Sequence, residues 1–289
     1  MRAQARMLPD GRRLHLQDGP IDLVLEAVGS PAGVQAAYAA AIRRFETVLD
    51  ELCAELGELR APFHRSRRFS GPVARRMQAA VSPYGEGCFI TPMAAVAGSV
   101  AEEILGAMVA AAPLARASVN NGGDIALHLA TGESLRIGLV DRPDRPGLFG
   151  SATIRSGDPV RGIATSGWRG RSFSLGIADA VTILADPAAQ ADAAATIVAN
   201  AVDLPGHPAV ARLPAREVQN DSDLGDLPVT RGVGALAPGE TDEALARGLA
   251  RAEQLIGRGL IRAAALHLQG RTALTSDVHS GATQALEAA

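Results

Sequence analysis

The stretch from residue 117 to residue 184 constrains the fold most, because it predicts a run of short strands. The predicted strands cover residues 117–120, 125–129, 135–140, 151–155, 162–165 and 173–184. Turn sequences such as Ala130-Thr131-Gly132-Glu133 and Ser156-Gly157-Asp158-Pro159 separate them, as in β-hairpins. We therefore expect antiparallel strands in a layered α+β fold, and not a strict alternation of parallel strands and helices.

Helical patterns flank this stretch on both sides. Ser30-Pro31 predicts the N-cap and first position of a helix to about residue 59. Further helices are predicted over residues 92–111, 187–202 and 240–256. An opening β-meander over residues 6–26 and a closing hairpin of residues 260–268 and 272–275 complete the regular structure. The Pro-, Gly- and Asp-rich residues 203–241 are expected to be irregular.

Length and composition indicate one globular domain. The 289 residues are 47% hydrophobic and 20% charged, as in an ordinary folded protein. We expect a single domain over residues 1–276 and a flexible tail over residues 277–289. Aromatic residues make up only 3%, so Ala, Val, Leu and Ile must fill the core. This argues against a protein that stacks single-stranded bases on aromatic side chains.

The charge pattern excludes several classes of function. The net charge of -3 gives no reason to expect a nucleic-acid partner, and all 28 basic residues are arginines. A lysine base or Schiff base is therefore excluded. Cys53 and Cys88 have no metal-ligand spacing. Because residues 1–19 show no secretory signal and the apolar run near residues 107–115 is short, we expect a soluble cytoplasmic protein with no membrane partner.

The predicted helix over residues 187–202 is the most informative element for function. Asp192, Thr196 and Asn200 fall on one stripe of this helix, and Asp192 is its only ionisable residue. An ordinary solvated face is one interpretation. Short oxygen ligands one turn apart also suit Mg²⁺, which takes one or two protein carboxylates together with phosphates and water.

Two glycine-containing turns are candidate nucleotide sites. Asn121, Gly122, Gly123 and Asp124 lie where one predicted strand ends and the next begins. Paired glycines let backbone N–H groups reach an anion, although a tight hairpin uses the same residues. Thr165, Ser166 and Gly167 form a second small-residue turn with two hydroxyls.

Asp179 is a further candidate, because it lies in an apolar segment where an unpaired carboxylate would be costly. Arg169 or Arg171 is its expected partner, unless the acid faces a ligand. The arginine-rich residues 60–76 are interpreted as a solvated surface, with a phosphate clamp as the alternative. No histidine has metal-ligand spacing, and no serine hydrolase, Walker or Rossmann motif is present.

Taken in order, several segments resemble the ApbE-like superfamily, and within it the UPF0280 family. These segments are Gly11-Arg12-Arg13-Leu14, Gly19-Pro20-Ile21-Asp22, Pro92 to Gly98, Val119 to Asp124, Gly162 to Gly167 and Ala191 to Thr196. The resemblance spans nearly the whole chain and implies an α+β layered fold related to the T-fold.

The resemblance also implies a site and a reaction. The characterised ApbE branch consists of FAD:protein FMN transferases, which use Mg²⁺, transfer FMN to a threonine of an acceptor protein and release AMP. By motif position Asp192 and Thr196 match the metal-binding Asp and Thr, and a backbone carbonyl near Ala97 completes the metal site. Gly122, Gly123 and Asp124 match the turn that lines the flavin nucleotide. Asp192, Thr196 and Asp179 are the catalytic candidates, and the implied ligands are FAD and Mg²⁺.

This chain departs from the ApbE pattern in two places. Arg171 to Gly176 stand where ApbE proteins carry a His-Ile-x-Asp-Pro motif, and Ala97 stands where they have a lysine. Mg²⁺-dependent FMN transfer or cleavage of the FAD pyrophosphate is therefore one hypothesis. A flavin-, nucleotide- or pterin-binding module without turnover is the second, and a partner in an assembly is the third. The sequence does not determine the oligomeric state, and a homo-oligomer is one of the alternatives.

Overall fold

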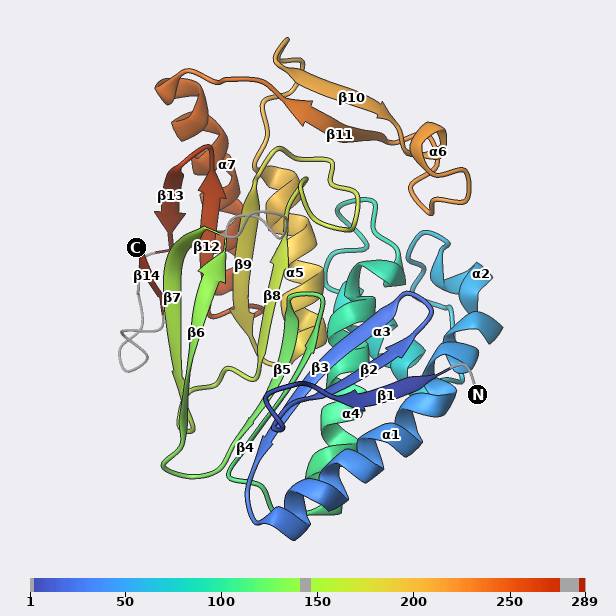
Figure 1. Ribbon diagram of the computed structural model, residues 1–289. Helices are drawn as coiled ribbons and strands as arrows, with labels where there is room; N and C mark the ends of the chain where they lie inside the picture. Colours follow the sequence, from blue (N-terminus) through green and yellow to red (C-terminus); the bar gives the residue numbers. More distant parts are fainter. Residues whose placement is uncertain (1–2, 141–146, 276–285, 289) are drawn as a thin grey trace. The chain divides into compact units, whose positions relative to one another are not determined.

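In the computed structural model the described residues are 3–140, 147–275 and 286–288, and they form two compact units. The first unit contains residues 1–135, 155–164 and 185–193, and the second contains residues 136–154, 165–184 and 194–289. Strand β8 and helix α5 begin in the first unit and end in the second, and single ends of β6, β7 and β9 also fall in the first unit. The structure has mixed helices and antiparallel sheets (Figure 1), so the predicted α+β class is confirmed.

The first unit consists of a sheet and the helices packed on it. Its strands, in sheet order, are β1 (Gln4–Met7), β2 (Leu14–Asp18), β3 (Ile21–Val28), β4 (Arg116–Asn121), β5 (Asp124–Leu129) and the start of β8 (Gly162–Ser166). The pairs from β1 to β5 are antiparallel, as is the pairing of β5 with β8. Strands β2 and β3 alternate buried residues, all apolar except Asp18, with more exposed ones, as expected for a sheet with one face in the core.

Helices α1 and α4 pack on this sheet. The helices of the first unit are α1 (Pro31–Ala54), α2 (Leu56–Leu59), α3 (Pro72–Val81), the 3₁₀ turn η1 (Pro92–Ala95) and α4 (Val96–Ala111). Helix α1 begins as predicted, because the Ser30 hydroxyl accepts a hydrogen bond from the Gly33 N–H group at 3.1 Å. Helix α4 packs against α1, β4 and β5, and its buried residues include Val100, Ile104 and Met108.

The segment 92–111 is long and apolar enough, by length and composition, to cross a membrane. A core helix of a globular protein passes the same test. In this chain Glu102 and Glu103 interrupt the apolar sequence and form ion pairs with Arg76. The packing and the ion pairs identify α4 as a core helix of the first unit.

The second unit has three groups of strands. Strands β9 (Ala180–Ala185), β12 (Ala263–Leu268) and β13 (Arg271–Leu274) are antiparallel neighbours, and α7 (Pro238–Gly257) packs against β12 and β13. Strands β6 (Ser134–Val140), β7 (Leu148–Arg155) and β14 (Leu286–Ala288) form a second sheet, and β10 (Val210–Pro214) pairs with β11 (Pro228–Val233) next to the short helix α6 (Ala215–Val218). The remaining helix, α5, covers Ala188–Ala201.

Two local predictions were wrong. The segment predicted to be irregular contains the antiparallel strands β10 and β11. Residues 173–179 do not continue the strand predicted over 173–184, because β9 begins at Ala180. The predicted tail lies outside the described residues except for Leu286–Ala288, which pair with β7 instead of fraying.

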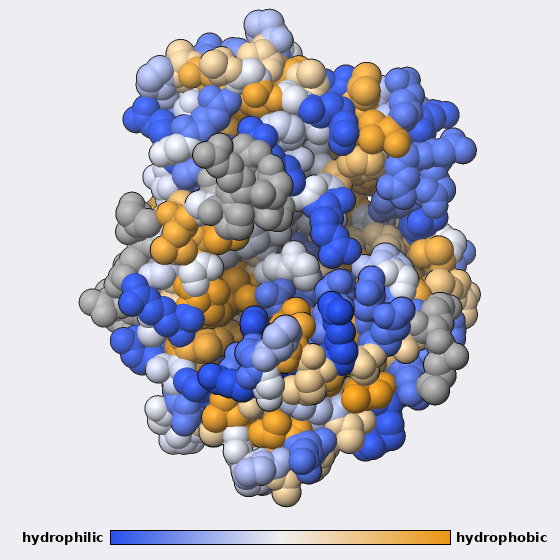
Figure 2. All heavy atoms as spheres, viewed as in Figure 1, coloured by the Kyte–Doolittle hydropathy of each residue, from blue (hydrophilic) through white to orange (hydrophobic). Residues whose placement is uncertain are grey.

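Large apolar side chains are exposed at scattered positions among the described residues. They are Met7, Phe89, Val140, Leu148 and Leu213. The face drawn in Figure 2 mixes hydrophilic and hydrophobic residues. Isolated exposed apolar side chains of this kind are normal for a globular protein and need no partner to explain them.

Candidate functional site

The site lies in the first unit, where the start of α4 meets the start of α5. The Gly98 N–H group, in the first turn of α4, donates a hydrogen bond to Oδ2 of Asp192 at 2.9 Å. The Asn121 side chain, at the end of β4, donates from Nδ2 to the Ala97 carbonyl oxygen at 3.2 Å. Ala97, Asn121 and Asp192, three residues predicted from sequence to belong to the site, are therefore brought together.

The position of Asp192 depends on a very close approach of two helices. A Cβ atom on Gly98 would lie 2.5 Å from the Ala188 carbonyl oxygen, which real side chains do not allow. A Cβ atom on Gly162 of β8 would lie 2.2 Å from the Ala188 Cα atom. Glycine is therefore required at both positions, and it seats the first turn of α5 directly against α4 and β8.

The Asp192 carboxylate is electrostatically unfavourable as it stands. Burial raises its pKa well above the ordinary value, and the nearby Asp124 carboxylate raises it further. The hydrogen bonds from Gly98 and Ala97 work in the opposite direction, because they favour the charged form. Among the described residues, no basic side chain shifts the pKa of Asp192.

Asn121 and Asp124 are held by the hairpin between β4 and β5. They are register partners, and the two residues between them, Gly122 and Gly123, have φ angles of 66° and 113°. Paired positive φ values are what a two-residue hairpin turn requires. The Gly123 N–H group is held by Oδ1 of Asn120 at 2.8 Å, and a Cβ on Gly123 would meet no atom within 4 Å. The turn is thus a rigid hairpin tip with open space beside Gly123.

Thr196 lies one helical turn after Asp192 on α5 and is half-buried. Within the described part of the chain its hydroxyl makes no side-chain hydrogen bond. Asn200, the third member of the predicted stripe, has a different role. Its Oδ1 atom accepts hydrogen bonds from the Leu175 N–H group at 2.9 Å and from the Ser174 hydroxyl at 3.3 Å. Asn200 therefore binds residues 174–175 through hydrogen bonds. Asp192 and Thr196 remain the two candidate ligands on this helix.

The turn of Thr165, Ser166 and Gly167 belongs to the second unit and contacts the segment before β9. The Thr165 and Thr182 hydroxyls lie 2.9 Å apart. A Cβ on Gly167 would lie 2.3 Å from the Asp179 carbonyl oxygen, so glycine is required there too. The assignment of these residues to cofactor binding stays a prediction.

Asp179, the third predicted catalytic residue, is well paired. Its carboxylate accepts hydrogen bonds from Arg169 Nε at 2.7 Å, Trp168 Nε1 at 3.2 Å and the Gln269 N–H group at 2.7 Å. Arg169, one of its two expected partners, also stacks on the Trp168 ring at 4.2 Å. These contacts explain how the Asp179 carboxylate can be buried when it binds no ligand. The catalytic role of Asp179 stays a prediction.

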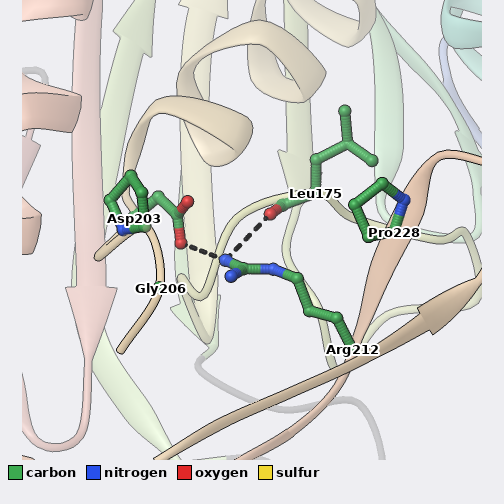
Figure 3. Close-up of a pocket in the computed structure, with 6 residues that line it drawn as sticks. Leu175, Asp203, Gly206, Arg212 and Pro228 are labelled. Carbon is green, nitrogen blue, oxygen red and sulfur yellow. Dashed lines mark hydrogen bonds and ion pairs between the residues drawn. The ribbon is translucent and has the colours of Figure 1, made fainter. Parts of the chain in front are cut away.

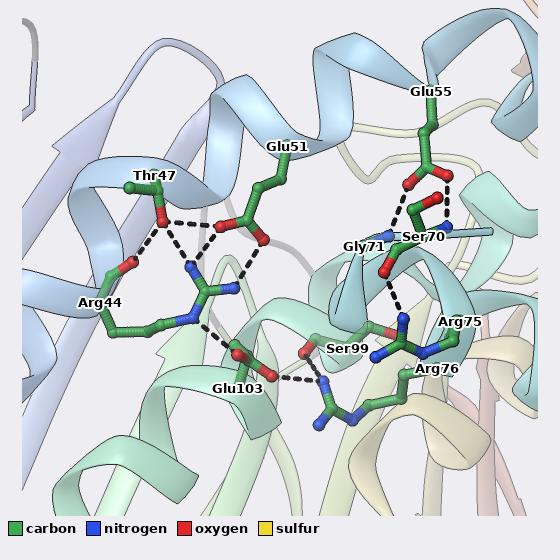
Figure 4. Close-up of polar contacts among 10 residues, drawn as sticks. All are labelled: Arg44, Thr47, Glu51, Glu55, Ser70, Gly71, Arg75, Arg76, Ser99 and Glu103. Atoms are coloured by element: carbon green, nitrogen blue, oxygen red, sulfur yellow. Dashed lines mark hydrogen bonds and ion pairs between the residues drawn. The ribbon is translucent and has the colours of Figure 1, made fainter.

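Polar contacts account for several side chains of the arginine-rich stretch. Arg67 pairs with Glu58 at 2.5 Å, and Arg65 pairs with Glu86. Arg76 reaches Glu102 at 2.9 Å. It also reaches Glu103 at 3.0 Å, while Arg75 donates to the Ser70 carbonyl oxygen (Figure 4). Arg76 thus joins α3 to α4, and Arg67 joins its loop to α2, which favours a structural role for these two arginines over a phosphate clamp.

The second unit contains a cavity of about 270 Å³ (Figure 3). It is lined by Leu175, Asp203, Pro205, Gly206, Arg212 and Pro228. One nitrogen of Arg212 binds both the Asp203 carboxylate and the Leu175 carbonyl oxygen. None of the predicted site residues lines this cavity, and the Arg212–Asp203 pair leaves its wall without net charge.

Sequence reasoning missed Gly98, Gly162 and Glu102 as parts of the site. The signal for Glu102 was available, because an acidic residue in the otherwise apolar helix 92–111 requires a partner. Among the described residues no group of three or more His, Cys, Asp or Glu side chains forms a metal site. The oxygen donors present still fit Mg²⁺, which takes one or two protein carboxylates and completes its shell with phosphate and water.

Comparison with known proteins assigns the family. The model of the family described as "AbpE bacteria" matches residues 5–274, and the chain therefore belongs to this family. It is 40% identical to a UPF0280 protein of Methanopyrus kandleri over 44% of this chain and 48% of the relative. A UPF0280 protein of Methanococcoides burtonii is 39% identical over 48% of this chain and 55% of the relative. The chain thus matches about half the length of these curated relatives.

Solved structures confirm the fold. The flavin transferase ApbE from Vibrio cholerae aligns over 95% of this chain and 98% of its own length, with a TM-score of 0.52 and 14% sequence identity. At this identity the likeness establishes the ApbE-like fold alone. The predicted membership of the UPF0280 and ApbE-like group is confirmed.

Proposed function

We propose that this protein binds a flavin nucleotide, FAD, through a divalent cation held at Asp192. One observation carries the proposal: the carboxylate of Asp192 is held at the Gly98 N–H group in the first turn of α4, and it lies close enough to Asp124 for that acid to disfavour its charge. A bound cation would favour the charged form of Asp192. The flavin transferase activity in the name of the Vibrio cholerae structure, together with the family assignment, supports FAD as the ligand.

Each residue of the proposed site has a separate role in binding the cation or the nucleotide. Asp192 and Thr196 on α5, with the Ala97 carbonyl oxygen at the start of α4, would hold Mg²⁺. When bound, Mg²⁺ would neutralise the pyrophosphate and polarise the phosphorus under attack. The hairpin at Gly122–Gly123 would lie along the nucleotide, because its open side has room for a ligand. Asn121 keeps the Ala97 carbonyl oxygen in place through its side-chain amide.

The proposed reaction breaks the pyrophosphate bond of FAD. A hydroxyl of an acceptor protein, or water, attacks the phosphorus of the FMN half, and AMP leaves with the electron pair of the broken P–O bond. In the proposed step the proton of the acceptor oxygen is released to solvent. We propose a cytoplasmic acceptor, in keeping with the expectation from sequence.

The test is incubation of the protein with FAD, Mg²⁺ and cell extract. The proposal predicts AMP release and a flavin-labelled protein band, both lost in Asp192→Asn and after addition of EDTA. Equal AMP release from wild type and Asp192→Asn would contradict it.

A second candidate function is flavin, nucleotide or pterin binding without turnover. The replacement of the histidine-bearing motif by Arg171 to Gly176 favours it, as does the attachment of this segment to Asn200. This candidate predicts cation-dependent FAD binding without AMP release in the same assay.

A further inference from the structure

Helices α4 and α5 each place an acidic side chain on the first turn of the other. Asp192 of α5 accepts the Gly98 N–H group of α4, and Glu102 of α4 accepts the Ala189 N–H group of α5 at 2.6 Å. The N–H groups of a first helical turn have no partner within their own helix, and an acid there is favoured by the helix dipole. Helix α4 has no capping side chain at its own N-cap, Ala95. The caps are therefore exchanged between the helices.

The two contacts are spaced so that they fix α5 in rotation as well as in distance. Glu102 lies four residues after Gly98, which is one turn further along α4. Ala189 lies three residues before Asp192, which is nearly one turn earlier on α5. A helix held at two points one turn apart on the same side cannot turn about its axis without breaking one of them. The close contacts of Gly98 and Gly162 with Ala188 set its depth.

Burial of the Glu102 carboxylate disfavours its charged form, which points to a specific role for this residue. Its side chain is 17% exposed, and burial raises its pKa. The neighbouring Glu103 resembles it in exposure and also binds Arg76, but its other partner is Arg44 of α1 (Figure 4). Packing of the α1–α3–α4 helices thus explains Glu103, whereas the contact with Ala189 is particular to Glu102.

We propose that Glu102 is a positioning residue for the cation site. By holding the Ala189 N–H group it keeps Asp192, one turn further along α5, in its position at the Gly98 N–H group. The inference rests on the proposed function, since it assigns Glu102 to the support of that same site. Groups that orient metal ligands in this way typically change metal affinity by about 10–100-fold when they are removed.

The test is a titration of the 289-residue chain with Mn²⁺, followed by electron paramagnetic resonance. In Glu102→Ala we expect the affinity for Mn²⁺ to fall about tenfold or more. Glu102→Gln retains an oxygen that accepts the Ala189 N–H group, so it should remain within about threefold of wild type. Glu102→Asp keeps the charge near Arg76 but is too short to reach Ala189, and it should lose affinity as the alanine variant does. It serves in place of Glu102→Ala if that variant does not fold.

Glu103→Ala is the matched control, because it removes two arginine contacts without touching α5. It should lose thermal stability and keep its Mn²⁺ affinity within about twofold, since its contacts hold only α1, α3 and α4. A second readout is amide hydrogen exchange of residues 188–191, which should become faster in Glu102→Ala and Glu102→Asp and stay unchanged in Glu103→Ala.

The outcomes separate the inference from the proposed function. If wild type binds no Mn²⁺, the proposed function fails and the positioning role falls with it. If wild type binds Mn²⁺ and Glu102→Asp or Glu102→Ala binds it equally well, the positioning role alone is overturned. If Glu103→Ala loses as much affinity as the Glu102 variants, the effect is general destabilisation and the inference is also overturned.

Discussion

Replacing Gly98 with alanine tests the close approach of α4 and α5 on which the site is built. The new Cβ atom would lie 2.5 Å from the Ala188 carbonyl oxygen and 2.9 Å from the Ala189 nitrogen, both of which are backbone atoms. The helices must therefore move apart by about 0.9 Å before the first of these distances reaches 3.4 Å, near the lower limit of ordinary contact. A shift of this size stretches the hydrogen bonds Gly98–Asp192 and Ala189–Glu102 beyond their normal range.

The expected cost follows from these contacts. Overpacking costs about 1–3 kcal/mol, and each weakened hydrogen bond to a carboxylate costs up to about 1.5–3 kcal/mol. The higher helix propensity of alanine offsets about 1 kcal/mol. If both bonds are lost, we expect a net loss of about 3–8 kcal/mol, which lowers the melting temperature by more than about 5 °C in a chain of this size.

The assay is thermal unfolding of the metal-free protein, followed by circular dichroism. Gly106→Ala is the matched control, because Gly106 lies on the same helix and a Cβ there meets no atom within 4 Å. That variant should gain up to about 1 kcal/mol from helix propensity. If Gly98→Ala melts at or above the temperature of Gly106→Ala, the helices are not in contact at Gly98 and the geometry of the site is wrong.

Three further predictions follow from the polar contacts. Asp192→Asn removes a charge next to Asp124 and retains an oxygen for the Gly98 N–H group. The metal-free variant should therefore melt no lower than wild type, but Mn²⁺ should not stabilise it. A melting temperature of the metal-free variant well below that of wild type would count against this prediction. Asp179→Asn weakens the pairing with Arg169 and should cost about 1.5–3 kcal/mol in urea unfolding, and an unchanged midpoint would contradict this. Although burial opposes it, hydrogen bonds from Arg44 and Arg76 lower the pKa of Glu103 below about 4.5, its ordinary value. The stability lost in Glu103→Gln should therefore be full above that value and should vanish as the pH falls through the lowered pKa; a difference that is constant with pH would refute it.

The sequence predicts regular elements well where periodicity or capping is local. Ser30-Pro31 and the apolar pattern after residue 92 locate α1 and α4, and paired glycines locate the β4–β5 turn. The sequence did not predict the strands β10 and β11, and it predicted that β9 begins at residue 173 instead of at Ala180. Both depend on pairing with other strands, which local residue preference does not report.

For the site, too, local motifs could be predicted from sequence and long-range contacts could not. Ala97, Asn121, Asp124 and Asp192 could be chosen by motif. The bonds Gly98–Asp192 and Glu102–Ala189 join residues 94 and 87 positions apart, and no local pattern reports them. The partner of Asp179 could only be narrowed to two arginines, since the choice depends on where the 167–171 turn places each side chain.

Calorimetric titration of FAD into the protein, with Mg²⁺ and with EDTA, tests the central claim most directly. The account predicts FAD binding to wild type that requires Mg²⁺, with binding at least tenfold weaker in EDTA and in Asp192→Asn. FAD binding of equal strength in all three conditions, or no binding to wild type in the presence of Mg²⁺, would contradict the claim that a cation at Asp192 holds a flavin nucleotide.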